Sequence, residues 1–402
     1  MNPVTGSAFV YLSAVKILVV FGLLFLLIAF WTLVERRGAG FIQNRLGPNR
    51  VGPQGLFQPV ADGLKNFFKE ETLPPFADRA LFLLAPIMAF IPAFLTFSVV
   101  PFAAPLPTPW GLLGMQVADL PVGFLFIFAI SSLGVYGLVL AGWSSNNKYA
   151  LLGGLRGAAQ LISYEIAMGL AAMAVLVFAG NISLNEIIAK QQASVWFVLP
   201  LFLAFFFFLV AAFAETNRMP FDLPEAESEL VAGYHTEYSA MKFAMFYLAE
   251  YSSMVTASGL MVCLFFGGWD IPFTSWDNTP PWSITKTVLT FGAFWAKTLF
   301  FLWLYVWVRW TIPRFRFDQL MDLGWKVLLP SSLGYVMFVA VAVWAVERSG
   351  VAFGIREGLI LAVCNVVLAF LFFKGLDRNR VLGGPANRGR ETWRRAASGG
   401  GA

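Results

Sequence analysis

The chain has 402 residues, of which 58% are hydrophobic and only 13% carry a charge. Because soluble domains have about a quarter charged residues, this composition excludes an ordinary soluble globule and predicts an integral membrane protein. Cys263 and Cys364 are the only cysteines, and His235 is the only histidine. These counts exclude an iron–sulfur cluster, a bis-histidine haem and a conventional zinc site within the chain, so any redox centre would have to come from partner proteins.

Apolar runs long enough to cross about 30 Å of hydrocarbon recur nine times along the chain. They predict an all-α membrane domain over residues 1–376, followed by a basic and disordered cytoplasmic tail over residues 377–402. The nine predicted membrane helices are Tyr11–Val34, Leu81–Val100, Val122–Trp143, Ala159–Ala179, Val195–Ala214, Lys242–Gly267, Thr287–Trp310, Val327–Val346 and Ile355–Lys374.

The basic residues predict how the chain is oriented in the membrane. Most of the 28 Lys and Arg residues lie in the tail, or in and beside the connections after the first, third, fifth and seventh spans. The exceptions are Lys16, Lys190, Lys286, Lys297, Arg348 and Arg356. Because cytoplasmic loops carry the excess of positive charge, this distribution predicts a periplasmic N-terminus and a cytoplasmic C-terminus.

The loop between the first two spans contains two Gly-Pro turns, Gly47-Pro48 and Gly52-Pro53, and then the segment Gln58–Glu71. The apolar residues of this segment fall near one face and its charged residues elsewhere, which predicts an amphipathic helix in the membrane interface. The apolar face consists of Val60, Leu64, Phe67 and Phe68. The helix could be a plain surface anchor or the floor of a pocket covered by a soluble partner.

The segment Ala214–Tyr238 is acidic, although it follows the fifth span on the side predicted to be cytoplasmic. Arg218 is its only Lys or Arg, and its acids are Glu215, Asp222, Glu225, Glu227, Glu229 and Glu237. Carboxylates crowded in this way repel one another, so some of the loop pKa values should rise and protons should be shared. The sequence Asp222-Leu-Pro-Glu225 is typical of a capped helix start, so we expect an ordered loop with a helix beginning there.

Three charged residues lie inside predicted spans: Glu165, Glu250 and Lys297. Each would cost several kcal/mol if it faced lipid, so each should face a polar interior with a partner. Static ion pairs between helices would satisfy this requirement, and so would a proton path. Carboxylates at graded depth below an acidic loop favour the proton path for Glu165 and Glu250, whereas Lys297 is left open.

The most specific sequence lies in four long blocks, Glu35–Glu71, Trp143–Glu165, Ala214–Tyr251 and Arg309–Pro330. They include GPNRVGP in the first loop and ETNRMPFDLPE in the acidic loop. In this order, and on the side predicted to be cytoplasmic, the blocks resemble the H subunit of the bacterial proton-translocating NADH:quinone oxidoreductase, respiratory complex I. That subunit is the homologue of mitochondrial NADH dehydrogenase subunit 1.

The resemblance implies a subunit of a translocase in the cell inner membrane, at the junction between its hydrophilic and membrane arms. It implies quinone as substrate, FMN and iron–sulfur clusters in partner subunits, and no metal or nucleic acid bound by this chain. The partners would be hydrophilic quinone-site subunits and small membrane subunits. The family core of eight helices would end near residue 346, which makes the helix at about 355–374 an addition.

The resemblance also implies roles for residues at matching positions. The proton-path group would be Glu165, Glu215, Glu225, Glu227, Glu229 and Glu250. The quinone chamber would be lined or gated by Glu35, Arg36, Arg45, Asp62, Lys65 and Arg218, with Glu35 and Arg218 between the two groups.

Two other functions fit parts of the pattern. A proton-coupled secondary transporter could use the same carboxylates, although such folds usually have internal repeats and helices interrupted at the midplane, and no repeat is evident here. The equivalent subunit of a membrane-bound hydrogenase or ferredoxin oxidoreductase would keep the fold and change the electron donor. Co-purification with iron–sulfur proteins and flavin would separate a transporter from a subunit of a redox complex.

Overall fold

The computed structural model describes residues 7–272, 274, 276–350 and 354–376. The tail predicted over residues 377–402 lies outside this described part. Eight described helices are long and apolar enough to cross a membrane, the seventh being α11 and α12 joined by a π-helical segment, Leu323–Leu328. Their bounds are α1 Ser7–Ile42, α3 Arg79–Leu95, α4 Gly123–Ser144, α5 Lys148–Ala179, α9 Ala240–Phe265, α10 Ile284–Thr311, α11 Phe317–Asp322, α12 Leu329–Arg348 and α13 Ile355–Leu376.

The remaining predicted span is a shorter apolar helix, α7 Phe202–Glu215. Its 14 residues rise about 21 Å at 1.5 Å per residue, which is less than the hydrocarbon thickness of about 30 Å. With α7 included, the fold is the all-α membrane protein of about nine spans that the hydropathy pattern predicts.

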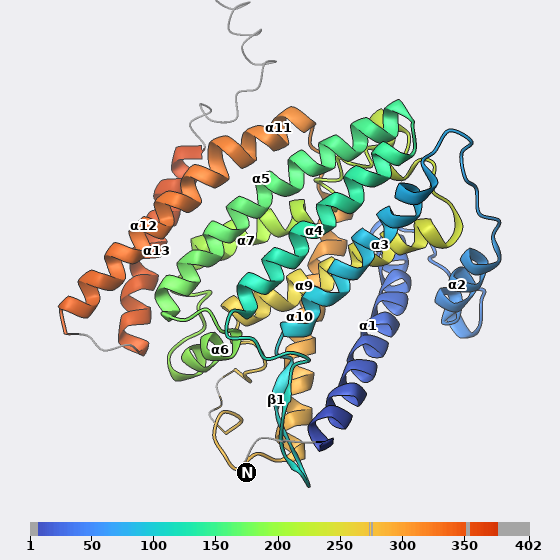
Figure 1. Cartoon of the computed structure of the whole chain (residues 1–402). Helices are drawn as coiled ribbons and strands as arrows, with labels where there is room; N and C mark the ends of the chain where they lie inside the picture. The colour runs from blue at the N-terminus through green and yellow to red at the C-terminus, as the bar shows by residue number, and fades with distance from the viewer. Residues whose placement is uncertain (1–6, 273, 275, 351–353, 377–402) are drawn as a thin grey trace, which may run out of the picture.

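The helix predicted in the first loop is confirmed as α2 Gln58–Phe68, with a proline in its first turn. All four residues of its apolar face are exposed in the isolated chain: Val60, Leu64, Phe67 and Phe68. In Figure 1, α2 lies at the edge of the bundle, and its exposed apolar face is free to contact lipid or a partner.

Two elements outside the membrane helices were not predicted. Strands β1 Ala103–Thr108 and β2 Gly111–Met115 form an antiparallel hairpin, and α6 Leu184–Ala193 is a short helix. The prolines Pro105 and Pro107 make β1 a poor strand by composition, because proline cannot donate to a strand ladder.

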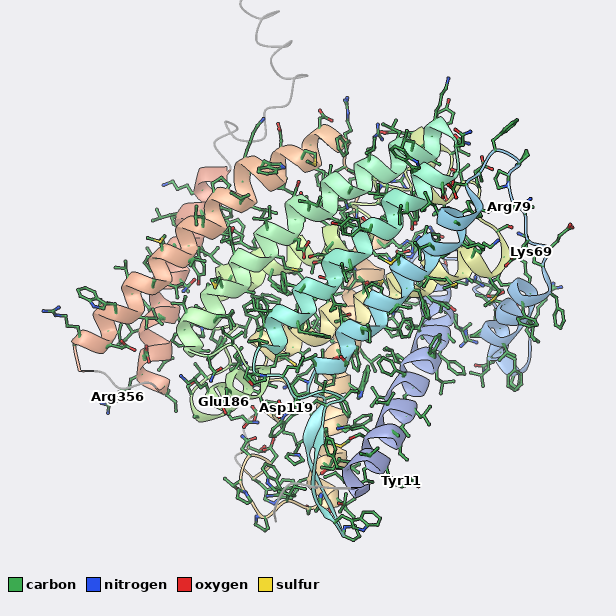
Figure 2. The ribbon with its side chains drawn as sticks, in the orientation of Figure 1. Tyr11, Lys69, Arg79, Asp119, Glu186 and Arg356 are labelled. Atoms are coloured by element: carbon green, nitrogen blue, oxygen red, sulfur yellow. The ribbon has the colours of Figure 1, made fainter. Side chains whose placement is uncertain are left out.

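The elements outside the spans define two ends of the molecule. We call the end formed by α2 and the loop between α7 and α9 the acidic end, and the end formed by β1, β2, α6 and the loop between α9 and α10 the hairpin end (Figure 1). Helices α3, α4 and α5 run side by side between them, and α12 and α13 lie along one edge. Charged side chains such as Arg79 at one end and Asp119 and Glu186 at the other mark the two ends in Figure 2.

Two local predictions were wrong. Helix α5 begins at Lys148, after an Asn147 cap, rather than near Ala159, because hydropathy undervalues its first, glycine-rich turns. The segment from Asp222 to Glu225 forms turns, and the helix that follows, α8 Glu227–Leu230, has no side-chain cap. Burial of this segment against neighbouring helices therefore overrode the local capping signal.

Candidate functional site

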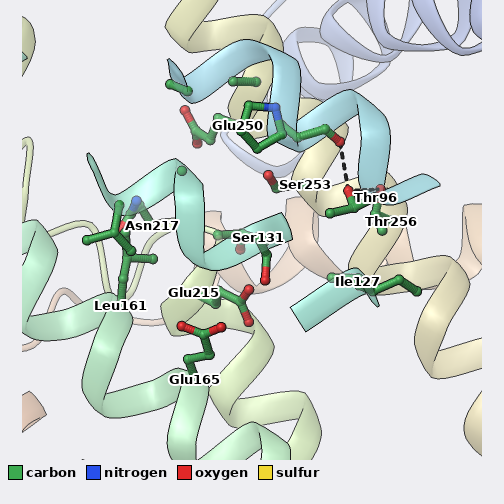
Figure 3. Close-up of a pocket in the computed structure, with 18 of the residues that line it drawn as sticks. Thr96, Ile127, Ser131, Leu161, Glu165, Glu215, Asn217, Glu250, Ser253 and Thr256 are labelled. Carbon is green, nitrogen blue, oxygen red and sulfur yellow. Dashed lines mark hydrogen bonds between the residues drawn. The ribbon is translucent and has the colours of Figure 1, made fainter. Parts of the chain in front are cut away.

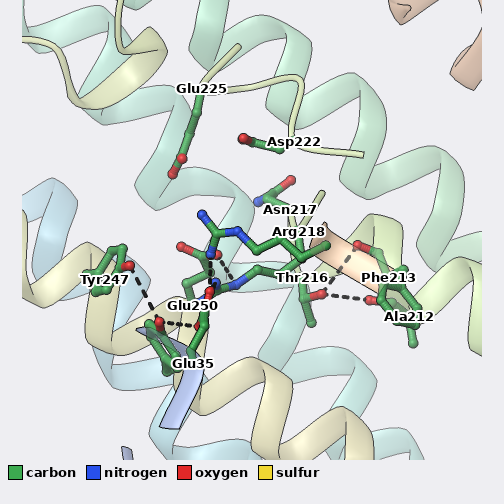
Figure 4. Close-up of polar contacts among 12 residues, drawn as sticks. Glu35, Ala212, Phe213, Thr216, Asn217, Arg218, Asp222, Glu225, Tyr247 and Glu250 are labelled. Carbon is green, nitrogen blue, oxygen red and sulfur yellow. Dashed lines mark hydrogen bonds and ion pairs between the residues drawn. The ribbon is translucent and has the colours of Figure 1, made fainter. Parts of the chain in front are cut away.

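Arg218 is the centre of a buried charge cluster at the acidic end. It lies three residues after the end of α7, and only 3% of its side chain is exposed. Its guanidinium donates to both carboxylate oxygens of Glu35, at 3.0 and 3.2 Å. It also forms an ion pair with Glu250 of α9 and lies 4.2 Å from the ring centroid of Tyr251. Figure 4 shows Arg218 beside Glu250, with Glu35 nearby. One cation thus holds two carboxylates from different helices.

Glu35 is the second centre of this cluster. It lies on α1, is 5% exposed, and accepts hydrogen bonds from Arg309 of α10 and from the hydroxyl of Tyr251 as well as from Arg218. Four segments therefore meet at one carboxylate: α1, the acidic loop, α9 and α10. Removing one partner of such a buried pair costs about 3–5 kcal/mol, because the other charge is left without compensation.

A cavity of about 110 Å³ lies beside this cluster and is lined by Glu165, Glu215 and Glu250. In Figure 3 the carboxylates of Glu165 and Glu215 point toward one another, with Glu250 across the cavity. Ser132 donates a hydrogen bond to Glu165, whereas the buried Oε2 of Glu215 has no hydrogen-bond partner within the described chain. A water molecule needs roughly 10–15 Å³ of such space, so several waters can bridge these carboxylates.

Asp222 lies in the acidic loop and is 7% exposed. Its Oδ2 accepts a hydrogen bond from Arg314 at 3.0 Å, and its Oδ1 is buried without a partner among the described residues. Burial first, and then the neighbouring Glu225 carboxylate, raise the pKa of Asp222 to about 8, against the lowering effect of nearby arginines. The carboxyl group can therefore take up and release a proton near neutral pH.

Glu225 pairs with His235, the only histidine, at a distance of 3.3 Å. Burial raises the pKa of Glu225, but the hydrogen bond and charge of His235 outweigh it and bring the pKa below its ordinary value. Burial likewise lowers the pKa of His235, and Glu225 outweighs it, so the histidine pKa ends above its ordinary value. Each shift favours the charged form of its side chain.

A close contact within the loop holds these groups in place. Gly233 has a φ of +57°, and a Cβ atom built there would lie only 1.7 Å from the carbonyl oxygen of Pro224. Gly153 of α5 also approaches the loop closely, because its Cβ would lie 2.6 Å from the amide nitrogen of Tyr234. The acidic loop is thus folded on itself and packed directly on α5, as the expectation of an ordered loop requires.

Two predicted proton-path residues lie outside the buried cluster. Glu227 and Glu229 are exposed on α8, and Glu229 forms an ion pair with Arg156 at 2.6 Å. Neither lines the cavity between Glu165 and Glu215. The structure therefore separates the six predicted carboxylates into four that are buried or partly buried and two at the surface.

The residues predicted for the quinone chamber also divide into some that lie outside the buried cluster and some that belong to it. Arg36 forms an ion pair with Asp62 of α2 at 2.6 Å, and Arg45 donates to Gln43 at 2.7 Å. Arg45 and Lys65 are exposed. Glu35 and Arg218 instead belong to the same buried cluster as Glu250. Two residues of the chamber set, Glu35 and Arg218, therefore share one network with Glu250 of the proton-path set. The other four chamber residues lie outside that network.

Sequence reasoning missed two members of this network, Arg309 and Tyr251. Arg309 lies at the end of a span, where a basic residue is explained by topology alone, and only its contact with Glu35 distinguishes it. Tyr251 follows Glu250 directly, and its role depends on α1 packing against α9. Both residues lie within the four blocks, which is the only sequence signal that could have identified them.

Lys297, left open by the sequence, has its partners at the hairpin end. Its ammonium donates to the carbonyls of Phe266, Gly268 and Asp270 at 2.7, 3.1 and 2.6 Å, and lies 4.3 Å from the ring centroid of Trp196. These carbonyls follow the end of α9, where a helix has unpaired carbonyls. Lys297 therefore caps α9 and is remote from the carboxylate cluster.

Among the described residues, no group of three His, Cys, Asp or Glu side chains is placed to hold a metal ion.

Known proteins are similar in sequence over most of the chain. The NADH dehydrogenase family matches residues 15–340. The H subunit of the NADH-quinone oxidoreductase of Leptospira biflexa is 49% identical over 337 residues, which cover 81% of this chain and 93% of that protein. The H subunit from Rhodospirillum rubrum is 50% identical over 78% of this chain and 88% of its own length, and one from Koribacter versatilis is 47% identical over 84% and 98%. The chain therefore belongs to the NADH dehydrogenase family, together with these H subunits.

Proposed function

We propose that this chain is the subunit of respiratory complex I that forms much of the quinone-access chamber and couples quinone reduction to proton translocation. The observation that carries the proposal is the buried network in which Arg218 joins Glu35 to Glu250 beside the cavity of Glu165 and Glu215. Buried carboxylates that share one cation and contact a cavity with room for water can exchange protons without leaving the membrane interior.

The quinone would reach the acidic end from the bilayer, between the membrane helices and α2. Its apolar tail needs an apolar wall, and its headgroup needs polar residues at the end of that wall. The ion pair of Arg36 with Asp62 joins the end of α1 to α2, at the edge of the bundle where such a wall would open. Glu35 is the residue before Arg36 on α1, so a headgroup held near Arg36 is close to the buried network.

Reduction of the headgroup changes the charge beside this network. Two unit charges about 6 Å apart interact by about 3 kcal/mol at an effective dielectric constant near 20. That energy corresponds to about two pKa units, which is enough to move a proton between carboxylates. Through Glu35 and Arg218, the change would reach Glu250 and then the pair of Glu165 and Glu215.

The loop carboxylates would supply the protons. Asp222 and Glu225 lie above the Arg218 cluster in Figure 4, and the pKa of Asp222 near 8 suits a group that exchanges protons near neutral pH. This route requires the acidic end to face the cytoplasm and the N-terminus of the chain to face the periplasm. FMN and iron–sulfur clusters would belong to partner subunits that cover the acidic end.

Affinity purification through this chain, in mild detergent, tests the assignment. We expect it to isolate flavin and iron–sulfur proteins together with NADH:quinone reductase activity. When the purified complex is reconstituted into vesicles, its turnover should acidify the solution that faces its periplasmic side. A chain that isolates alone and carries out proton-coupled solute uptake would be a secondary transporter. A complex that accepts electrons from hydrogen or ferredoxin but not from NADH would be the hydrogenase-type relative, and either result would reject the proposal.

The chamber is tested by Asp62→Ala in the assembled complex. Loss of the contact with Arg36 should raise the KM for short-chain quinones about threefold or more, with kcat little changed, because the residue would act in binding. Asp318→Ala is a suitable control, since this carboxylate is half-exposed and its contact with Arg316 is 3.5 Å long. An unchanged KM in a natively assembled Asp62→Ala complex would contradict the chamber role.

A further inference from the structure

Helix α13 lies beyond the residues that the NADH dehydrogenase family matches, which end at 340. It packs against α7 and lies beside α12 at the edge of the bundle (Figure 1). Most of its surface is apolar and exposed, as expected for lipid contact, with Val366 70% exposed. Asn365, the residue before Val366, is only 1% exposed. A buried amide in a membrane helix needs hydrogen-bond partners, and these partners identify what the helix does.

The partners lie at the interrupted start of α7. Residues 197–201 form turns, and the regular hydrogen bonds of α7 begin with the Phe205 amide donating to the Leu201 carbonyl at 3.0 Å. The carbonyl of Pro200 precedes this ladder and accepts instead from Nδ2 of Asn365. Inside a membrane, a backbone group without a partner costs several kcal/mol. Asn365 therefore provides the bond that the helix does not make for itself.

Tyr335 of α12 completes the arrangement. Its hydroxyl donates to Oδ1 of Asn365 at 2.7 Å, and the backbone amide of Ala204 lies within hydrogen-bonding reach of the same hydroxyl. Nδ2 of Asn365 also contacts the carbonyl of Leu361, one turn earlier in α13, at 3.2 Å. The two side chains thus connect the amide of Ala204 to the carbonyl of Pro200, a pair that one more turn of regular helix would have joined directly.

We propose that Asn365, acting with Tyr335, is a positioning residue that completes the backbone hydrogen bonding at the start of α7 and so fixes the helix that ends at Glu215. The second half of this statement rests on the proposed function, in which Glu215 exchanges protons. Because α7 has only 14 residues and is tightly packed, a shift at its start is transmitted along it to Glu215. The ninth helix would then contribute to the proton path without touching it.

Hydrogen exchange of the assembled complex tests the first half. Asn365→Leu removes both hydrogen-bonding atoms at similar volume, and Tyr335→Phe removes only the hydroxyl. In both variants the amides of residues 201–206 should exchange about tenfold faster or more, a factor that corresponds to about 1.4 kcal/mol. Val366→Ala changes the exposed neighbour and should leave this exchange as in the wild type. Tyr335→Phe keeps the test decisive if Asn365→Leu does not assemble. Unchanged exchange in the variants that assemble would overturn the proposal.

The pH profile of quinone reductase tests the second half. Asn365→Leu and Tyr335→Phe should lower kcat several-fold at an unchanged quinone KM and should shift the pH optimum, whereas a purely structural loss would lower activity equally at every pH. Faster exchange with a wild-type pH profile would overturn the link to Glu215. Hydrogen exchange needs neither quinone nor pumping, so the role of Asn365 and Tyr335 at the start of α7 can be confirmed even if the proposed function fails.

Discussion

The two ends of the molecule bury charge in opposite ways. At the hairpin end, both oxygens of Asp270 accept hydrogen bonds, from Trp196 and Asn278, and the ammonium of Lys297 is held by three backbone carbonyls. At the acidic end, Arg218 is shared between two glutamates, and Glu215 and Asp222 each keep a buried oxygen without a partner among the described residues. Buried charges therefore differ between the two ends in how fully their hydrogen bonds are satisfied.

The difference lies in whether the hydrogen-bond partners are fixed. Backbone carbonyls and an indole N–H cannot change protonation state, so at the hairpin end these partners of Asp270 and Lys297 cannot exchange protons with them. Carboxylates that share one cation and border a cavity have several protonation states of similar energy. We therefore expect the acidic end to respond more strongly than the hairpin end to a change in nearby charge, and the following predictions test that distinction, from the largest expected effect to the smallest.

Removing the shared cation should have the largest effect. Arg218→Met leaves Glu35 and Glu250 buried without their common partner, which should lower the free energy of unfolding by about 3–5 kcal/mol and reduce the fraction of assembled complex. Thermal unfolding and the yield of complex after affinity purification measure this loss. Arg36→Met is the matched control: its pair with Asp62 is half-exposed and should contribute less than about 1 kcal/mol. Equal losses in the two variants would contradict the central role of Arg218.

Neutralising Glu215 should affect activity rather than stability. Glu215→Gln removes an ionisable group that borders the cavity, and we expect the coupled rate of quinone reduction and pumping to fall about a hundredfold, the lower range for loss of a proton-transfer group. Unfolding should change little, because its buried oxygen has no partner to lose among the described residues. Glu227→Gln, on the exposed side of α8, should reduce both rates far less. Wild-type rates in an assembled Glu215→Gln complex would exclude Glu215 from the path.

Lys297→Met should give the opposite result at the hairpin end. The substitution removes the cation that caps α9, and hydrogen bonds to a charged group contribute about 1.5–3 kcal/mol each, so stability should fall by about 2 kcal/mol. Turnover per assembled complex should remain at the wild-type level. A large loss of pumping at normal assembly would show that Lys297 also moves protons and would remove the contrast between the two ends.

Hydropathy predicted the membrane helices well, because a span is a local property of about 20 residues. The limits of α9 differ from the predicted Lys242–Gly267 by only two residues at each end. The errors arose where tertiary contacts outweigh local preference. The glycines at the start of α5 pack against the acidic loop, and the prolines of β1 are tolerated because the strand has a single neighbour.

The site was predicted by residue type and not by geometry. Glu35, Arg218 and Glu250 were all identified, but Glu35 and Arg218 were assigned to the chamber and Glu250 to the proton path. Their contact joins residues 183 positions apart, and no spacing in the sequence encodes it. Arg309 was missed for the same reason, since its partner lies 274 positions away. Charged residues near membrane edges have several possible explanations until the packing of the helices is known.

The smallest effect concerns the pH dependence of stability. The pKa of Asp222 is raised from its ordinary value to about 8, so between about pH 4 and pH 8 the folded chain holds a proton that the unfolded chain releases. The stability that this proton contributes is present at low pH and is lost as pH rises toward 8. Asp222→Asn cannot ionise, so it should unfold like the wild type near pH 5 and be more stable than the wild type at pH 8.5.

Thermal unfolding of the assembled complex at the two pH values measures this difference, with Asp62→Asn in the half-exposed pair on α2 as the control. If Asp222→Asn is already destabilised at pH 5, the carboxylate is ionised there and its contact with Arg314 is a fixed ion pair. The acidic loop would then resemble the hairpin end, and proton uptake would have to begin at the cavity between Glu165 and Glu215.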